Sequence, residues 1–551
     1  MSSTLQTVLL SSLAKVLPNE KPTGAFYKNP MCCLNESFNF QIAYSSENPN
    51  WLHQYIHIEI DSKLKDYISI SSVELVPSNF PCYAGADADY LMRTPGLLPD
   101  LLMPLKVPAV KVMPTQWRSL WFCLTPPADL TAGDYPVTIS LKDGNGNIAA
   151  EHTFTLSILN TYLPKQKTIH TEWFHTDGIA QFYNVPVFSE RYWDLVANFM
   201  QTAAKHSVNM ILTPLFTPPL DTEVGGERLT VQLVDIELDD LGHYHFNFDK
   251  LAKWIKLATE AGMEYFEMSH LFTQWGANAT PKIMVRVNGE LQKRFGWHVA
   301  AKDESYKAFL DAFLSELKNF LDSQGLQGKC YFHISDEPSL DQIDNYKEAH
   351  DLVQGHLEGY PLMDALSNLE FYEKGIIDYP VCANDHITPF IEAKVPNLWA
   401  YYCCAQSVQV SNRFMALPSF RNRILGVQLY KYHIPGFLHW GYNFYNSHLS
   451  KRAINPFLVT DADMTFPSGD AFLVYPGEDG ALESIRIKVL AEAFQDIRAL
   501  ELLESLTSRE EVLALIEENT DEPITFSVYP RTETYLLKLR EKVNAKIAEL
   551  V

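Results

Sequence analysis

The chain has 551 residues, of which 46% are hydrophobic and 20% are charged, and its formal net charge at pH 7 is −23. A chain of this length and hydrophobic content is expected to bury large cores in two or three domains. The acidic balance argues against nucleic acid and anionic membranes as partners, because both are bound through basic patches. No apolar run approaches the roughly 18 residues that a membrane-spanning helix needs.

The N-terminus and the cysteines both predict a cytoplasmic protein. The opening segment Met1–Leu10 has no basic residue and is followed by Ser11 and Ser12, so it is typical of an amphipathic segment and not of a signal peptide. The eight cysteines include two adjacent pairs, Cys32–Cys33 and Cys403–Cys404, and no CxxC spacing. Adjacent cysteines rarely bridge each other, which favours free thiols in a reducing compartment.

Residues 35 to 165 alternate between apolar and polar positions with a period of two, as half-buried strands do. Tyr55–Ile60 is one such strand. Residues 137–141 and 154–158 form two apolar faces, and Asp143–Gly146 supplies turn residues between them, so a hairpin is expected. Because this part has no long helical pattern, residues 1–165 are predicted to form an antiparallel β-sandwich.

After Pro164 short strands alternate with longer amphipathic helices. Apolar side chains recur at helical spacing from Tyr192, Leu251 and Tyr306, and Ser189 is placed to cap the first of these helices. Eight strands alternating with helices predict a (β/α)8 barrel over residues 166–506. The predicted strands are Ile169–Phe174, Asn209–Thr213, Glu264–Met268, Tyr331–Ser335, Pro361–Ala365, Pro380–Ala383, Leu398–Cys403 and Gly436–Tyr442.

The last part of the chain is predicted to be helical. A short strand, Ala471–Tyr475, precedes a long helix over residues 482–506 that is placed to close the barrel. Two further helices are expected near residues 509–518 and 532–550, and they form a C-terminal helical tail over residues 507–551.

The most informative stretch is Cys330–Pro338, in which an apolar strand runs into Asp336 and Glu337 and is followed by proline. Proline has no N–H for a sheet and disfavours helix in the residue before it, so the strand is expected to end at Glu337. The carboxyl-terminal ends of barrel strands carry the chemistry. Two adjacent carboxylates in different surroundings can divide acid and base work, which predicts a glycosidase site. The alternative is that the pair, with Ser339 and Asp341, caps the next helix.

A conventional nucleophile is missing from the predicted barrel. Glycosidases of the common retaining kind carry a second carboxylate near the end of strand seven, yet no Asp or Glu occurs between Glu392 and Asp461. Either the nucleophile comes from elsewhere, or the substrate supplies it, as the acetamido oxygen of a 2-acetamido sugar does. In the second case Asp336 would orient the acetamido group, while Glu337 would protonate the leaving oxygen and then activate water.

Three segments resemble glycoside hydrolase family 123 and the related barrel domains of unknown function. They are Ser335–Pro338, His439–Asn443 and Gly469–Gly477, and residues 120–135 are similar to the β-sandwich that precedes such barrels. The resemblance spans most of the chain, with its motifs in the same order. It implies a β-N-acetylgalactosaminidase that acts with retention through substrate assistance, with the two adjacent carboxylates in the roles just given.

Aromatic and amide side chains at the ends of the last two predicted strands are candidates for sugar binding. Trp440, Tyr442 and Asn443 end strand eight, where a tryptophan can stack on the apolar face of a sugar, although core packing explains such a run almost as well. Tyr401 and Tyr402 end strand seven, and only one of them is expected to face the barrel interior, because side chains alternate along a strand. That tyrosine is placed to donate its hydroxyl to the acetamido carbonyl.

Weaker candidates follow other strands. His270 follows strand three, and Asn384, Asp385 and His386 follow strand six, where they suit contacts to sugar hydroxyls. Loop histidines are more often ordinary surface residues. Trp275, in the long loop before residue 301, is a candidate lid aromatic.

No metal or cofactor is predicted. No His and Cys cluster has zinc spacing, the acidic residues near Asp461 lack the EF-hand pattern, and no phosphate-binding loop occurs. The expected partner is a glycan or small oligosaccharide, and a homo-oligomer stays open. Two alternatives also stay open: a glycosidase of this barrel with another sugar or mechanism, and a carbohydrate-binding protein without activity.

Overall fold

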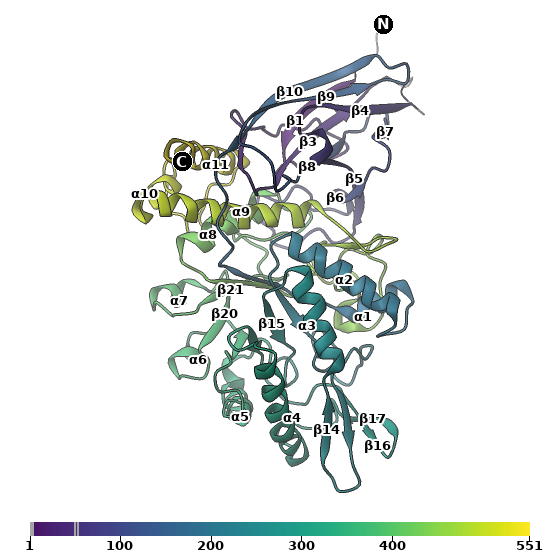
Figure 1. Ribbon diagram of the computed structural model, residues 1–551, viewed down its shortest axis with the longest axis vertical. Helices are drawn as coiled ribbons and strands as arrows, with labels where there is room; N and C mark the ends of the chain where they lie inside the picture. The colour runs from purple at the N-terminus through teal and green to yellow at the C-terminus, as the bar shows by residue number, and fades with distance from the viewer. Residues whose placement is uncertain (1–4, 49–50, 52–53) are drawn as a thin grey trace.

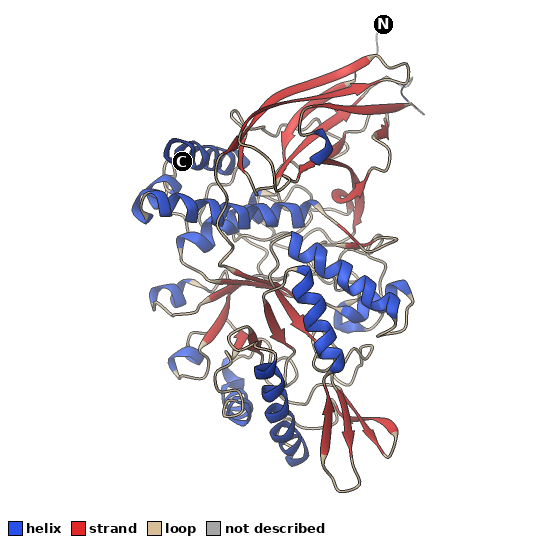
Figure 2. Ribbon diagram, viewed as in Figure 1, coloured by secondary structure: helices blue, strands red, loops and turns tan. Residues whose placement is uncertain are grey.

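Two β-sheet bodies and a set of C-terminal helices make up the protein, whose computed structural model describes residues 5–48, 51 and 54–551. A pair of sheets lies near the N-terminus, a parallel barrel lies at the centre, and C-terminal helices lie between the two (Figure 1). Figure 2 shows helices around the barrel and at the base of the N-terminal sheets. Within the described residues no helix is long and apolar enough to cross a membrane.

The N-terminal part is a sandwich of two five-stranded sheets. Its pairings are antiparallel, apart from one parallel pairing between its second and tenth strands. The predicted hairpin around Asp143–Gly146 is confirmed, since the two strands that flank it pair in register. Apolar side chains from both sheets, including Phe122 and Ile139, fill the space between them. In spatial order the sheets are β1 (Gln6–Ser11), β3 (Phe38–Ser45), β8 (Arg118–Leu124), β5 (Ile68–Ser78) and β6 (Gly96–Pro104), and β2 (Met31–Cys33), β10 (Ile148–Leu159), β9 (Gly133–Lys142), β4 (Tyr55–Asp61) and β7 (Ala109–Lys111).

Eight parallel strands form the central sheet, as predicted. The two end strands approach each other at Phe332, whose N–H donates to the Pro361 carbonyl at 2.9 Å and which bridges to Leu362. The sheet is therefore a nearly closed barrel, and the predicted (β/α)8 architecture is confirmed. In spatial order its strands are β18 (Cys330–Phe332), β15 (Tyr265–Met268), β12 (Met210–Thr213), β11 (Ile169–Glu172), β22 (Gly436–His439), β21 (Trp399–Tyr401), β20 (Tyr379–Ala383) and β19 (Met363–Ala365).

Helices follow the barrel strands in the chain, and their ends carry the expected signals. Ser189 caps α2 by accepting a hydrogen bond from the Tyr192 N–H. Gly262 ends α3 with a φ of 108°, a left-handed conformation that suits glycine. These helices are α1 (Thr176–Tyr183), α2 (Glu190–Lys205), α3 (Asp249–Ala261), α4 (Glu304–Ser323), α5 (Ile343–Val353), α6 (Glu370–Glu373), α7 (Thr388–Glu392) and α8 (Phe420–Lys431).

The strand that leads to the carboxylate pair ends earlier than predicted. β18 ends at Phe332 and not at Glu337. Beyond it, the N–H groups of Ile334 and Ser335 donate to the Asp364 carboxylate at 3.1 and 3.2 Å instead of to a neighbouring strand. The Asp364 carboxylate thus accepts the hydrogen bonds that a neighbouring strand would accept, and the strand ends several residues before Pro338. Sequence periodicity cannot predict such a contact with a distant side chain.

A small sheet that periodicity missed lies in the loops after β12 and β15. It contains β13 (Asp235–Leu238), β14 (Tyr244–Asn247), β16 (Ile283–Val287) and β17 (Glu290–Phe295), and it projects away from the sandwich (Figure 1). The segment before residue 301, which was expected to be one long loop, therefore holds two strands. Five of the six residues of β17 are exposed, so the strand lacks the apolar face by which it would be recognised.

The C-terminal helices share a core with the sandwich and the barrel helix α8. Their bounds are α9 (Ile485–Leu506), α10 (Arg509–Ile516) and α11 (Glu533–Leu550). Arg540 of α11 forms a 2.7 Å ion pair with Glu36 of the sandwich. Of the strand expected over residues 471–475, only Tyr475 is in a strand. It belongs to β23 (Tyr475–Pro476), which forms a hairpin with β24 (Ala481–Leu482). The domain boundaries at residues 165 and 506 stay predictions.

Three smaller points complete the fold. All eight cysteines are free, as predicted. Residues 1–4 of the opening segment lie outside the described residues, and its remainder from Gln6 is the end strand of a sandwich sheet. Single turns of 3-10 helix occur at η2 (Lys65–Tyr67), η3 (Leu340–Gln342) and η4 (His448–Ser450).

Candidate active site

A cavity opens at the carboxyl-terminal ends of the barrel strands, where barrels of this kind carry their chemistry. Its volume of about 200 Å³ is below the roughly 300–1,000 Å³ of ordinary ligand pockets, so it suits one sugar ring better than a long chain. Seven barrel strands or the loops after them contribute to its wall. The lining residues are Trp173, Leu220, Asp221, Gln274, Trp275, Asp336, Glu337, Ala365, Tyr401, Cys403, Cys404, Leu438, Trp440, His448 and Phe466.

The carboxylate pair after β18 lies in this cavity and is held by its backbone. The Glu337 N–H donates to the Ala365 carbonyl at 3.1 Å, and the Ser335 hydroxyl donates to the Thr273 carbonyl at 2.8 Å. Glu337 has a φ of 44°, in the left-handed region. Such a conformation costs a non-glycine residue about 1–3 kcal/mol, and strain of this kind concentrates at functional sites.

Tyr401 is the tyrosine of strand β21 that faces the carboxylate pair. Its hydroxyl donates to Glu337 Oε1 at 2.7 Å. Burial and the Glu337 carboxylate raise the pKa of Tyr401 well above its usual range, so the phenol stays protonated and acts as a donor. Tyr402 does not line the cavity. Its side chain is buried in the main hydrophobic core, where its ring packs against Phe437 and His439.

The two carboxylates differ in exposure and in charge. Asp336 is half-buried and Glu337 is exposed at the cavity mouth. Burial raises the pKa of Asp336 well above its usual range, and the Glu337 carboxylate raises it further, while the positive charge of His333 opposes both effects. Burial and the neighbouring carboxylate therefore both favour the neutral form of Asp336.

A buried histidine beneath the pair supplies that positive charge. His333 lies between Asp364, 2.8 Å from its Nδ1, and Glu267, 2.5 Å from its Nε2. Burial disfavours its charged form, but hydrogen bonds from both ring nitrogens to these carboxylates raise the pKa of His333 to about 10. His333 is therefore an imidazolium, and through the Asp364 bonds to Ile334 and Ser335 it anchors the segment that carries the pair.

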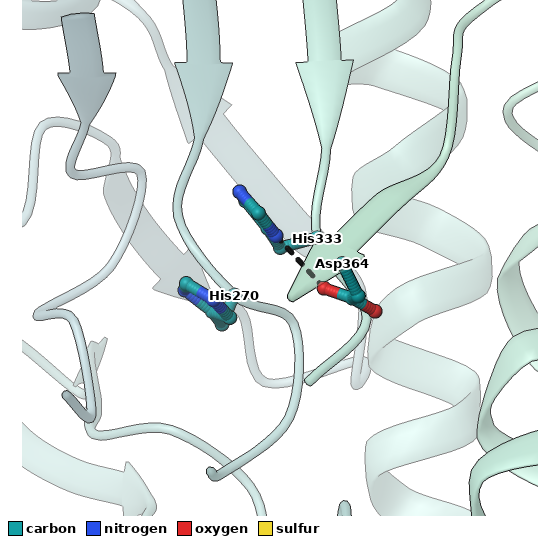
Figure 3. A group of neighbouring side chains, drawn as sticks. All are labelled: His270, His333 and Asp364. Carbon is teal, nitrogen blue, oxygen red and sulfur yellow. Dashed lines mark hydrogen bonds and ion pairs between the residues drawn. The ribbon is translucent and has the colours of Figure 1, made fainter. Parts of the chain in front are cut away.

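One group of three side chains among the described residues has ligand atoms close enough for a metal ion: His270, His333 and Asp364. Figure 3 shows His270 beside His333, with the hydrogen bond from His333 to Asp364 drawn as a dashed line. Both nitrogens of His333 already bond to carboxylates, so this ring has no lone pair to offer. His270 stacks on it with ring centroids 4.3 Å apart, and burial and the adjacent cation lower the pKa of His270 well below its usual range. The stacking of a neutral ring on an imidazolium accounts for the close approach of His270 to His333.

Two tryptophans in the cavity wall are each anchored by a buried carboxylate. The Trp440 Nε1–H donates to Asp470 Oδ2 at 2.9 Å, and the Trp173 Nε1–H donates to Glu267 Oε1 at 2.6 Å. Because each indole is tied down at its nitrogen, its position in the wall is fixed. Asp470 belongs to the Gly469–Gly477 segment, which gives that segment a structural link to the cavity.

Comparison with known proteins agrees with this architecture. Residues 173–503, more than half of the chain, match the model described as the glycoside hydrolase 123 catalytic domain. This chain belongs to glycoside hydrolase family 123. No curated protein matches the sequence. The predicted family is confirmed, and the chain is a glycoside hydrolase.

Solved structures show the same fold for a family 123 enzyme. A family 123 glycoside hydrolase from Clostridium perfringens, studied for glycolipid glycan hydrolysis, covers 99% of this chain and 98% of its own length at 15% identity with a TM-score of 0.73. A β-glucuronidase from Parabacteroides merdae covers 85% of this chain and 51% of its own length at 12% identity with a TM-score of 0.32, which is too low to support any argument. The first likeness is one of fold alone.

In this family 123 enzyme four of the predicted site residues meet in the cavity, and the others lie elsewhere. Asp336, Glu337, Tyr401 and Trp440 line it, and so does the candidate lid residue Trp275. The remaining candidates are buried in cores or lie outside the cavity wall. Tyr442 donates to the Phe199 carbonyl, Asn443 bonds to the backbone of His175, Tyr402 packs in the main hydrophobic core, His270 stacks on His333, Asn384 bonds to Ser411, and Asp385 and His386 bond to each other near the surface.

The cavity also contains residues that the sequence patterns missed. Trp173 directly follows β11 and carries the same signal as Trp440, an aromatic residue at a strand end. Asp221 and His448 lie in loops without periodicity, and they are neighbours in the cavity wall, with Asp221 Oδ1 and His448 Nε2 3.7 Å apart. Phe466 packs edge-on against Trp440, with ring centroids 5.3 Å apart. No local sequence signal joins these loops, because they meet only in the folded barrel.

Proposed function

We propose that this family 123 hydrolase releases a terminal β-linked N-acetylgalactosamine with retention, and that the acetamido group of the sugar is the nucleophile. The proposal rests on one observation: Asp336 and Glu337 are adjacent in the chain and share a small cavity with aromatic walls. Adjacent residues point in different directions, so one can contact the acetamido group while the other reaches the glycosidic oxygen. The resemblance to the family implies the galactosamine configuration.

In the first step Asp336 accepts a hydrogen bond from the acetamido N–H and holds the carbonyl oxygen beneath C1. That oxygen forms a bond to C1, the bond from C1 to the leaving oxygen breaks, and the proton of Glu337 passes to the leaving oxygen. The product is an oxazolinium ion, whose positive charge is stabilised by the Asp336 carboxylate. Water then attacks C1 while Glu337 takes its proton, which restores the acetamido group and gives the β-anomer.

The raised pKa of Asp336 fits this sequence. Burial favours the neutral form of Asp336, and Tyr401 donates to Glu337. When the acetamido N–H reaches Asp336, it favours the carboxylate form there, and the proton moves to Glu337, where the leaving group needs it. Tyr401 is then free to donate to the acetamido carbonyl.

A second carboxylate in the cavity supports one alternative mechanism. Asp221 lines the same cavity, and its Oδ2 accepts the Leu449 N–H at 3.0 Å. In a conventional retaining mechanism a second carboxylate forms a covalent bond to C1. We propose instead that Asp221 binds sugar hydroxyls. Its polar neighbours, His448 and the Leu449 N–H, form with it a polar part of the cavity wall that suits such contacts.

A relative with a known structure supports a proposal for the substrate class. The Clostridium perfringens enzyme is described as hydrolysing glycolipid glycans, and we propose a glycan of that class for this chain.

The deciding experiment is hydrolysis of a panel of nitrophenyl glycosides by the wild type and by Glu337→Gln. We expect release from the N-acetyl-β-galactosaminide, competitive inhibition by the matching thiazoline, and loss of turnover in the variant. Azide should restore the rate on activated substrates, because it replaces water without needing a base. Binding of glycans without turnover would refute catalysis, and a covalent sugar on the enzyme would refute substrate assistance.

A further inference from the structure

Asp470 is a buried carboxylate that joins two parts of the cavity wall. Its Oδ2 accepts the Trp440 Nε1–H at 2.9 Å, and its carboxylate also accepts the backbone N–H of Cys404. Trp440 follows strand β22, Cys404 follows strand β21, and both residues line the cavity that holds the carboxylate pair. One side chain therefore connects the ends of two neighbouring barrel strands at the cavity.

Asp470 itself has no access to a bound sugar. Its side chain has no exposed surface, and it lies behind the cavity wall and not in it. Any effect of this carboxylate on the reaction must therefore pass through the residues that it holds.

The second oxygen of Asp470 is bonded to a buried histidine. His439 Nδ1 lies 2.6 Å from Nη2 of Arg413 and accepts the Gly441 N–H at 2.9 Å. Because both of these neighbours are donors, we assign the lone pair of the ring to Nδ1 and its proton to Nε2. The Nε2–H then donates to Asp470 Oδ1 at 3.3 Å. Burial and the charge of Arg413 lower the pKa of His439 well below its usual range, so the ring is neutral.

Arg413 extends these contacts to the inner barrel. Its Nη1 forms an ion pair with Glu172 Oε1 at 2.5 Å, and its Nη2 donates to the Gly441 carbonyl at 3.0 Å. Glu172 is the last residue of strand β11, and its side chain and that of Arg413 are fully buried. A continuous set of buried contacts thus runs from β11 through Arg413 and His439 to Asp470, and it fixes the position of the carboxylate.

A carboxylate in this place is costly to the folded protein. Burial raises the pKa of Asp470 to about 7, although the charge of Arg413 and the bond from Trp440 favour the ionised form. A buried group that works against stability and is bonded to the wall of an active site is typical of a residue retained for function.

We propose that Asp470 is a positioning residue of the hydrolase: by holding the Trp440 indole and the Cys404 backbone, it fixes the part of the cavity wall that places the sugar against Asp336 and Glu337. The inference rests on the proposed function only for the choice of the assay substrate. It assigns to the Gly469–Gly477 segment a role in the reaction that the cavity-lining residues alone do not reveal.

Two substitutions of Asp470 give a graded test. Asp470→Ala removes all three contacts, whereas Asp470→Asn keeps an oxygen for Trp440 but faces the His439 N–H with a second donor. On the nitrophenyl N-acetyl-β-galactosaminide we expect kcat/KM to fall about 100-fold for Asp470→Ala and about tenfold for Asp470→Asn, since small misplacements cost losses of this order. The Ki of the matching thiazoline should rise by the same factors, because a mimic of the reacting state needs the same placement.

A double-mutant cycle tests whether Asp470 acts through Trp440. Trp440→Phe keeps an aromatic ring but removes the N–H that Asp470 binds. We expect Asp470→Ala combined with Trp440→Phe to lose at least about fivefold less kcat/KM than the product of the two single losses. Trp254→Phe is the matched control: its buried indole donates to Thr213 Oγ1 at 3.2 Å outside the cavity wall, so its effect should multiply with that of Asp470→Ala.

The outcomes separate this inference from the proposed function. If the wild type does not hydrolyse this substrate, the proposed function fails, and the variants are compared on whichever glycoside of the panel is hydrolysed, with KM in place of Ki. A lower kcat with unchanged Ki and KM would mean only a smaller fraction of folded enzyme and would refute positioning. Multiplicative losses with Trp440→Phe, or equal losses for the Asn and Ala variants, would also refute it. A wild type that hydrolyses no glycoside of the panel would contradict both proposals.

Discussion

Replacing His333 with asparagine tests the charge network beneath the carboxylate pair. His333 is a buried cation between Asp364 and Glu267. A pKa raised from 6.5 to about 10 corresponds to a stabilisation of about 5 kcal/mol at acid pH, since each pKa unit is about 1.36 kcal/mol. This agrees with the loss of about 3–5 kcal/mol that follows when one partner of a buried ion pair is removed.

The stabilisation by His333 depends on pH with a definite sign. Its folded pKa lies above its unfolded pKa, so the contribution is complete below about pH 6.5 and disappears as the pH rises through 10. We therefore expect His333→Asn to reduce the free energy of unfolding by about 4–5 kcal/mol at pH 6 and by about 3 kcal/mol at pH 8.

Guanidinium unfolding of the wild type and the variant at pH 6, 7 and 8 measures this difference. His57→Asn, at an exposed position of β4, is the matched control and should have little effect at any pH. ¹⁵N-histidine NMR of the wild type should show one ring that stays protonated at pH 8. A loss below about 1 kcal/mol, or one that does not shrink with rising pH, would refute the imidazolium assignment.

Three further substitutions test other parts of the site. Tyr401→Phe removes the hydroxyl bound to Glu337 and should lower kcat/KM on the nitrophenyl substrate about 10–100-fold, the range for a hydrogen bond to a charged group; an unchanged rate would contradict this. Burial raises the pKa of Asp470 from 3.8 to about 7, so the unfolded chain releases this proton at a lower pH than the folded chain, and the wild type loses stability as the pH rises from about 4 to about 7. Asp470→Asn, which keeps an acceptor for Trp440, should gain about 3–4 kcal/mol relative to the wild type over that interval in pH-dependent unfolding, and a constant difference would contradict this. Asp221→Asn should raise KM and lower kcat less than about 100-fold, whereas a loss of about 10⁴-fold or more would identify a nucleophile.

The parts of the site that could be predicted from the sequence are those with a local signal. Asp336 and Glu337 follow an apolar strand and precede proline, and Trp440 ends another strand. These neighbours along the chain are enough to place the three side chains at the carboxyl ends of the strands. Barrel architecture followed from the same alternation of strands and helices.

The other parts depend on contacts between distant segments. Strand alternation allowed either Tyr401 or Tyr402 to face the interior, and only the Tyr401 bond to Glu337 distinguishes them. Asp221 and His448 are 227 positions apart in the sequence and meet only because the barrel closes. Tyr442 shares its aromatic run with Trp440, yet it packs in the core against Phe174. Strand β22 ends at His439, so strand alternation does not set the direction of the Tyr442 side chain.

The most direct test of the central claim is the rate of hydrolysis of nitrophenyl substrates whose acetamido methyl carries none, one, two or three fluorine atoms. Fluorine withdraws electrons from the carbonyl oxygen that is proposed to attack C1. We predict that kcat/KM falls steeply with each fluorine while Asp336 and Glu337 are intact. A rate that does not change along the series would contradict the account, since the carbonyl oxygen would then take no part in bond formation.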